Sequence, residues 1–230
     1  MLKNIYISLL ALSLSTASFS QDFGISASFF IPKNGYFSAP ISPLSIRGVT
    51  LVGNNMFSLD IGGSLYRISG MSMTGVPFET KEPTVGPFFN IMVPIEAVIH
   101  LGNKNFNFLI KGGGFAFYNF GTKLNYGTID RAIKNQLGLE LVNSDFSFDN
   151  TIGYGYEFGI EYIQYINKQF GITLGVNYFI GGANLNLRGT VKGLDNNGVL
   201  TVLTVEYPDS KLDYTGMEFS VGLLFSSGRR

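Results

Sequence analysis

Apolar residues alternate with small or polar residues, with a period of two, along most of the chain after residue 21. In residues 22–31, for example, Phe23 and Ile25 occupy one face, and Gly24 and Ser26 occupy the other. This alternation predicts β-strands with one apolar face and one less apolar face. The pattern predicts eight strands, at residues 22–31, 45–52, 56–69, 87–101, 106–119, 153–166, 170–180 and 212–225.

The connections between the predicted strands alternate in length. Three are short and contain asparagine, which favours tight turns, at residues 53–55, 102–105 and 167–169. Long connections follow the other strands, at residues 32–44, 70–86 and 120–152. All short turns therefore lie at one end of the sheet and all long loops at the other. Outer-membrane barrels have this arrangement, with short periplasmic turns and long extracellular loops.

The composition of the two strand faces favours a membrane barrel over a soluble sheet. The less apolar face has mostly Gly, Ser, Thr and Asn with isolated carboxylates, whereas a water-facing sheet normally has many Lys and Glu. Charged residues make up 14% of the chain, against about 25% in typical soluble domains. Aromatic residues gather near the strand ends, as in interfacial girdles: Phe57, Phe89, Phe106, Tyr154, Tyr178 and Phe225. We therefore predict an antiparallel up-and-down transmembrane β-barrel whose apolar face meets lipid.

Residues 1–20 have the features of a signal peptide. Lys3 provides a positive start, residues 5–14 form an apolar core, and small residues at 18–20 precede Gln21. The core is too short for a membrane-spanning helix, which needs about 20 residues. We expect cleavage near Ser20 and Gln21, which leaves residues 21–230 as one barrel domain; an uncleaved first strand is the alternative.

Charge and cysteine content exclude several function classes. The chain has 16 basic and 16 acidic residues and no run of Lys or Arg, so no basic surface is expected to attract nucleic acid. It has no cysteine, which excludes disulfides and thiolate-bound metals. No nucleotide-binding loop, metal-ligand cluster or nucleophile motif stands out in the sequence. We expect neither a cofactor nor a metal ion.

Residues 181–211 allow two interpretations. Asp195, Asn196, Asn197 and Gly198 predict a tight hairpin turn between two apolar segments. The favoured interpretation extends the last two predicted strands into an exposed two-stranded projection with this turn at its tip. The alternative counts both segments as membrane strands and gives a barrel of ten strands instead of eight.

Two local sequence features predict a short helix and a β-bulge. In the 120–152 connection, Thr128 is a candidate helix N-cap and Gly138 a candidate terminator of a short helix, although an ordinary surface loop is the favoured interpretation. Three consecutive glycines at residues 112–114 predict a β-bulge that switches the inward-facing parity of its strand.

Four charged residues fall at similar heights on the less apolar face. Asp60, Glu96, Lys111 and Glu161 each lie five or six residues from the short-turn end, and Glu157 and Glu218 share that face. The interior of an eight-stranded barrel is just wide enough to be filled by side chains. We therefore expect a buried polar cluster with Lys111 as its central cation. A proton or ion path through the carboxylates is the alternative.

Histidine occurs once in the chain, at residue 100, close to the short turn that begins at Gly102. Lipid-modifying enzymes and proteases of the outer membrane use a histidine at or near the outer side of their barrel. His100 is at the opposite end, so we expect an ordinary histidine at the rim and predict no catalytic residue.

The mature chain resembles the small eight-stranded barrels of the OmpA-transmembrane and OmpX type. The resemblance rests on the export signal, on the glycine- and tyrosine-rich segment at residues 153–159 and on the final strand that ends at Phe225. It implies recognition of that strand by the barrel-assembly machinery, although five residues follow Phe225. The expected barrel is not followed by a peptidoglycan-binding domain, so anchoring to the cell wall is not implied. We expect a monomeric outer-membrane protein with a structural or surface-interaction role and an extracellular protein partner bound through its loops. A small passive transport barrel is the alternative, ahead of a lipid-modifying enzyme.

Overall fold

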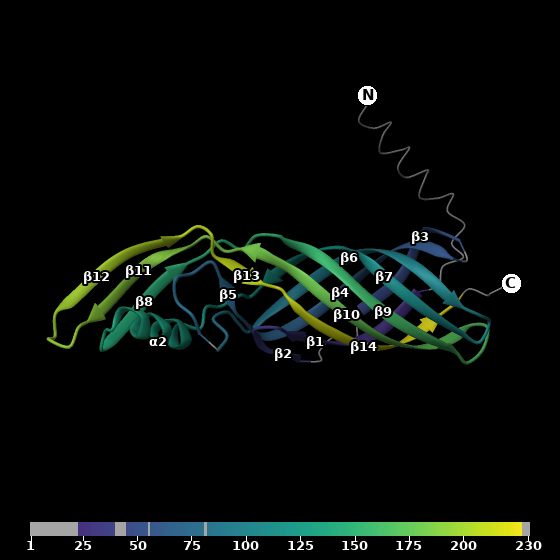
Figure 1. Cartoon of the computed structure of the whole chain (residues 1–230), viewed down its shortest axis with the longest axis horizontal. Coiled ribbons are helices and arrows are strands. Elements are labelled where there is room, and N and C mark those ends of the chain that lie inside the picture. The colour runs from purple at the N-terminus through teal and green to yellow at the C-terminus, as the bar shows by residue number, and fades with distance from the viewer. Residues whose placement is uncertain (1–22, 40–44, 55, 81, 227–230) are drawn as a thin grey trace, which may run out of the picture.

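The computed structural model describes residues 23–39, 45–54, 56–80 and 82–226, and the predicted signal peptide lies outside them. Antiparallel strands dominate, and they form an elongated molecule with a barrel-like part and a smaller lobe at one end (Figure 1). The strands of the barrel-like part are β1 (Phe23–Pro32), β3 (Ser45–Gly53), β4 (Phe57–Met71), β6 (Phe88–Gly102), β7 (Phe106–Phe120), β9 (Gly153–Tyr165), β10 (Phe170–Asn184) and β14 (Gly216–Phe225). The predicted all-β antiparallel architecture is confirmed, and the strand bounds differ from the prediction by at most four residues.

Hydrogen bonding links these strands in the order β14-β1-β3-β4-β6-β7-β9-β10. Strand β14 pairs with both β1 and β10, over ten residue pairs each, so the series of pairings returns to its first member. The β1–β3 pairing is short, with three residue pairs that begin at Gly24 and Arg47. Residues 40–44, which precede β3, lie outside the described residues.

Connections β3–β4, β6–β7 and β9–β10 are short and lie at one end of the barrel, which we call the tight-turn end. In each turn, the side-chain oxygen of the first asparagine accepts hydrogen bonds from backbone N–H groups two and three residues further on. Asn54, Asn103 and Asn167 take this role, which explains why asparagine recurs there. The other connections are long and gather at the opposite, long-loop end (Figure 1).

The predicted bulge at Gly112–Gly114 is wrong. Strand β7 pairs with β6 and β9 without a register shift, and residues on both sides of the glycines keep the same inward parity. Gly113 faces the interior, and an added Cβ would lie 2.0 Å from the carbonyl oxygen of Ile95, so the close strand approach explains the glycine. The register shifts lie in the β3–β4 pairing instead, between Ile46 and Val52.

The long loops build a separate lobe at their end of the molecule. Strands β8 (Leu141–Ser147), β11 (Leu187–Leu194) and β12 (Leu200–Tyr207) form a three-stranded sheet, so the predicted projection has three strands and not two. Neither β11 nor β12 pairs with the larger sheet. Short strand β2 (Gly35–Ala39) pairs with the long-loop end of β4, whereas short strands β5 (Met73–Thr74) and β13 (Lys211–Asp213) pair with each other between the lobe and the barrel strands.

Helix α2 (Tyr126–Leu137) packs against β8, so the 120–152 connection is not an ordinary surface loop. Its N-cap is Asn125 and not Thr128, whereas Gly138 ends the helix in the left-handed conformation as predicted. Ile129, Ala132 and Ile133 of the helix are buried in an apolar core that continues from the barrel into the lobe. Barrel residues such as Phe30 and lobe residues such as Val191 belong to that single core.

Candidate functional site

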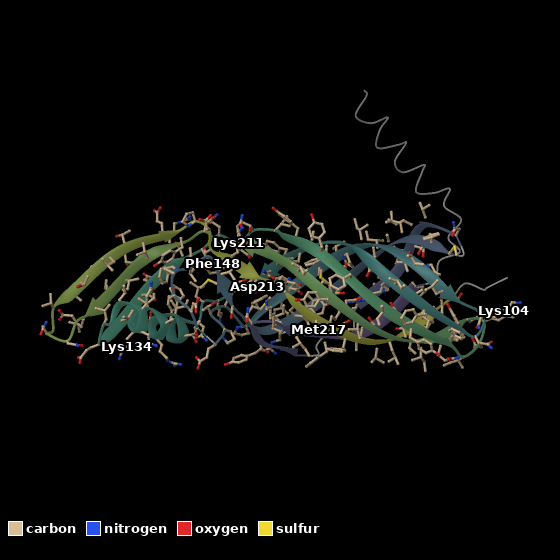
Figure 2. The ribbon with its side chains drawn as sticks, in the orientation of Figure 1. Lys104, Lys134, Phe148, Lys211, Asp213 and Met217 are labelled. Carbon is tan, nitrogen blue, oxygen red and sulfur yellow. The ribbon has the colours of Figure 1, made fainter. Side chains whose placement is uncertain are left out.

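The barrel strands expose apolar side chains and bury polar ones, which is the reverse of a soluble protein. Val221 and Tyr156, for example, are 58% and 76% exposed, whereas Asp60 and Glu218 are 4% and 0% exposed. Aromatic rings stack between neighbouring strands near both ends of the exposed surface, as in Phe89–Phe120 and Phe23–Phe225. Figure 2 shows outward side chains along the length of the barrel, with Lys104 at the tight-turn end and Lys134 in the lobe.

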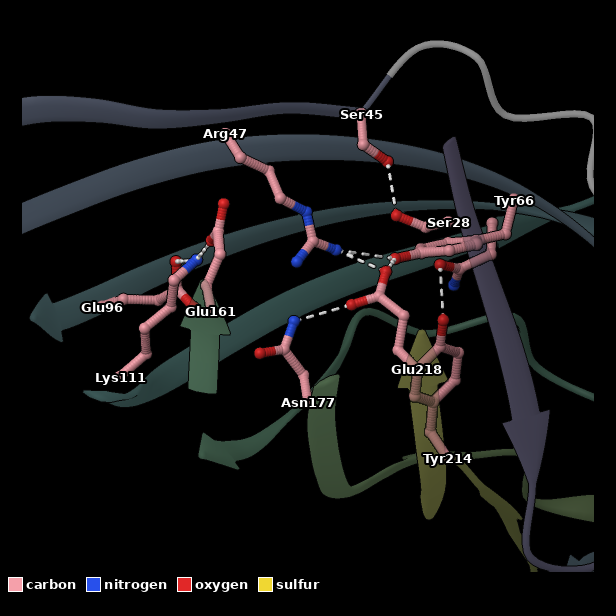
Figure 3. Close-up of polar contacts among 11 residues, drawn as sticks. Ser28, Ser45, Arg47, Tyr66, Glu96, Lys111, Glu161, Asn177, Tyr214 and Glu218 are labelled. Atoms are coloured by element: carbon pink, nitrogen blue, oxygen red, sulfur yellow. Dashed lines mark hydrogen bonds and ion pairs between the residues drawn. The ribbon is translucent and has the colours of Figure 1, made fainter. Parts of the chain in front are cut away.

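All six residues proposed for an interior polar cluster point into the space enclosed by the strands, which we call the lumen. Asp60, Glu96, Lys111, Glu157 and Glu218 are buried, and the side chain of Glu161 is 13% exposed. Lys111 forms ion pairs with Glu161 and, at 3.8 Å, with Glu96. The structure thus brings together three of the six residues, which are Lys111 and its two partners Glu96 and Glu161 (Figure 3).

Glu218 belongs to a second network, which the sequence did not reveal. Its carboxylate accepts hydrogen bonds from Arg47 and the Tyr66 hydroxyl, and Asn177 Nδ2 donates to it over 2.8 Å (Figure 3). Arg47 also donates to the Tyr66 hydroxyl at 3.3 Å. The guanidinium on β3 forms an ion pair with Glu218 on β14, two strands away in the sheet, so Arg47 neutralises Glu218 while Lys111 neutralises Glu161.

Three lumen carboxylates form an acidic row with fewer basic partners than Glu161 and Glu218 have. Asp60 stands directly opposite Glu96 in the β4–β6 pairing, and Gly113 separates Glu96 from Glu157 in the next two pairings. One oxygen of each carboxylate is buried without a hydrogen-bond partner. Five carboxylates and two cations face the lumen in the described residues, so this row holds the excess negative charge.

Apolar clusters lie in the lumen on both sides of the polar networks. Toward the long-loop end, Tyr214 stacks on Phe30 and contacts Phe117, with ring centroids 4.8 and 4.5 Å apart. Its hydroxyl donates to Asn90 Oδ1 at 3.2 Å. Toward the tight-turn end the lumen contains a second cluster of buried residues: Val98, Leu109, Ile163 and Leu224. The buried polar groups therefore lie between two apolar clusters.

The predicted hairpin tip connects β11 and β12 at the end of the lobe farthest from the barrel (Figure 1). Asn196, Asn197 and Gly198 are exposed there. The Asp195 carboxylate accepts hydrogen bonds from the backbone N–H groups of Val199 and Asn197 at 2.8 and 2.9 Å. These bonds, chiefly the one from Val199, lower the pKa of Asp195. The tip is thus a well-formed turn that presents amide groups to solvent.

His100 lies near the tight-turn end, as its position before Gly102 predicted. It is not isolated, because it contacts the side chains of Ser58 and Asn107. No sequence pattern indicated these contacts, which join three different strands. In the part of the chain that the structure describes, no three His, Cys, Asp or Glu side chains are grouped to hold a metal ion. No helix of that part is long and apolar enough to span a membrane.

Comparison with known proteins identifies the fold. No protein-family model matches the sequence, and no curated protein matches it. Among solved structures, outer membrane protein OprG from Pseudomonas aeruginosa aligns with a TM-score of 0.51 and 9% identity, over 91% of this chain and 97% of OprG. A major outer membrane protein from Thermus thermophilus aligns with a TM-score of 0.44 and 10% identity, over 89% and 98% of the two chains. The protein thus shares the β-barrel fold of OprG.

Proposed function

We propose that the protein is an integral β-barrel of a bacterial outer membrane, with eight membrane strands, a filled lumen and a surface-binding lobe. The observation that supports this most directly is the inverted arrangement of its side chains. Exposed apolar residues surround the barrel, while Asp60, Lys111 and Glu218 are buried inside. Such a surface is stable in lipid, because burying each apolar side chain away from water is favourable by about 1.5–3 kcal/mol. The long-loop end then lies outside the cell.

The apolar clusters on both sides of the polar networks support a structural or binding role over passive transport. An ion that crossed the lumen would have to displace the Tyr214 aromatic cluster and the Val98 cluster and to separate Arg47 from Glu218. Single-channel recording in planar bilayers tests this directly. We expect no unitary current steps from purified protein, and stable steps would support the transport barrel instead.

Strand β12 is the part of the lobe best suited to bind a protein partner. Its pairing with β11 is unbroken over eight residue pairs, and no described strand pairs with its other edge. Leu200 and Val202 on this strand are 63% and 55% exposed. An exposed, regular edge with apolar side chains can accept an extended strand from another protein. Deletion of residues 194–198 should therefore abolish adhesion to an extracellular partner while the barrel still folds.

The orientation of the barrel has its own test. We expect a cysteine in place of Asn197 to react with a membrane-impermeant thiol reagent on intact cells, because the lobe is outside. A cysteine in place of Lys104 in the opposite turn should react only after the cells are permeabilised. The reverse labelling pattern would refute this orientation. Purification of the mature protein as a folded monomer without detergent would refute the membrane assignment itself.

A further inference from the structure

Ser58, His100 and Asn107 meet at the tight-turn end of the lumen, on three adjacent strands. Ser58 is the second residue of β4, His100 is two residues before the end of β6, and Asn107 is the second residue of β7. Ser58 and His100 are partly exposed, whereas Asn107 is buried behind them. The group thus lies at the rim, where a small molecule can approach the serine and the histidine from the aqueous side.

The hydrogen bonds among these residues join a hydroxyl, an imidazole and an amide in sequence. Ser58 Oγ lies 2.8 Å from His100 Nε2, and Asn107 Nδ2 lies 3.1 Å from His100 Nδ1. In this orientation of the amide, Asn107 Oδ1 is buried without a partner. Rotation of the amide by half a turn places Oδ1 against Nδ1, so that Nδ1 carries the proton and donates it to Asn107. This rotation satisfies the buried oxygen and lets Nε2 accept the Ser58 proton.

We propose that Ser58, His100 and Asn107 form a serine nucleophile site that hydrolyses carboxylic esters. Ser58 Oγ attacks the acyl carbon while its proton passes to His100 Nε2, and the ester oxygen leaves with that proton as an alcohol. Water then attacks the acyl-serine, gives a proton to Nε2 and releases the acid, and Ser58 regains its proton. Asn107 is a positioning residue, because it holds the imidazole in the required tautomer and does not touch the ester.

The surroundings of the site indicate a short apolar acyl group. Val98 stands directly opposite Ser58 in the β4–β6 pairing, and Leu109 stands directly opposite His100 in the β6–β7 pairing. Both are buried in the apolar cluster that closes this end of the lumen together with Ile163 and Leu224. An acyl chain that enters beside Ser58 meets this apolar surface, whereas the alcohol part remains at the rim.

This activity is independent of the proposed binding role, because the two sites lie at opposite ends of the molecule. It replaces the expectation that His100 has no chemical role. That expectation rested on the position of His100 at the tight-turn end, whereas its contacts with Ser58 and Asn107 join three separate strands. Failure of the esterase test would leave the lobe and its partner unaffected.

The experiment uses the full mature protein in detergent micelles, with folding checked by far-UV circular dichroism and heat-modifiable gel mobility. We expect a fluorophosphonate reagent to label Ser58, as located by peptide mass spectrometry, and p-nitrophenyl butyrate to be hydrolysed. S58A should abolish both signals. The matched control S69A removes an exposed serine from the same strand and should retain them. Absence of labelling and of hydrolysis in the folded wild-type protein overturns the proposal, as does equal activity in folded S58A.

Variants of Asn107 separate positioning from a purely structural role. N107A should lower kcat by about 10²-fold with little change in KM, because the imidazole is no longer held in one tautomer. N107D keeps an oxygen that accepts from Nδ1 and should restore much of kcat. Equal kcat in folded N107A and the wild type would contradict the assigned role of Asn107.

Discussion

Replacement of Lys111 by methionine tests the charge arrangement of the lumen. Lys111 is 5% exposed and forms ion pairs with Glu161 and Glu96, and methionine has a similar length without the charge. Loss of one partner from a buried ion pair typically costs about 3–5 kcal/mol, because the remaining charge stays uncompensated. With a urea dependence of about 2 kcal/mol per molar, the midpoint of unfolding should fall by about 1.5–2.5 M.

The matched control is K104M, which removes a lysine from the exposed β6–β7 turn. Its effect should be within about 0.5 kcal/mol, as for most surface substitutions. Urea titrations of both variants in lipid vesicles, with resistance to trypsin as the readout of folding, measure the difference between their urea midpoints. The double variant K111M/E161Q should recover part of the loss, because it also removes the carboxylate left alone. Equal midpoints for K111M and K104M would refute the view that Lys111 neutralises the lumen.

Three further predictions follow from the lumen and the lobe. E157Q should raise the urea midpoint slightly, because Glu157 shares the acidic row with Glu96. E218Q should lower the urea midpoint, because it weakens the contacts with Arg47 and Tyr66. A lower midpoint for both variants would contradict an excess of negative charge in the lumen. V202K should abolish binding of a partner strand to β12 without changing the urea midpoint, and unchanged binding in a pull-down assay would exclude this edge. The lowered pKa of Asp195 means that its carboxylate stabilises the tip at pH above the unfolded value of 3.8, and this contribution is lost as the pH falls through the folded pKa. As the pH falls through the folded pKa, the amides of Asn197 and Val199 should lose protection against hydrogen exchange, measured relative to their intrinsic exchange rates. D195N should show no such acid-dependent loss of protection.

Much of the barrel was predictable because the alternation within each strand is a local property of the sequence. A period of two marks its length, and its parity separates outward-facing from lumen-facing residues, which is why Asp60 and Glu218 are predicted to lie inside. Contacts between distant strands leave no such local signal. Arg47 and Glu218 are separated by 171 positions, and the weak pattern of β3 did not identify the arginine as an interior residue.

The remaining errors have local physical reasons. The three glycines at 112–114 suggested a bulge, although Gly113 serves to let neighbouring strands approach closely within a regular register. Strand β8 was not predicted because its buried face combines Ser144 with Val142 and Phe146, which leaves little apolar alternation. The contacts of His100 were not predicted because they join separate strands, and Ser58 precedes His100 by 42 residues.

The single apolar core that runs from Phe30 in the barrel to Val191 in the lobe has a mechanical consequence. Helix α2 and the three-stranded sheet are not tethered by loose loops, and side chains such as Tyr214 and Ile129 lie within the same packed interior. A force applied at the Asn197 tip would therefore be transmitted through this packed core to the barrel strands. A partner that holds the lobe would fix both the position and the tilt of the barrel relative to itself.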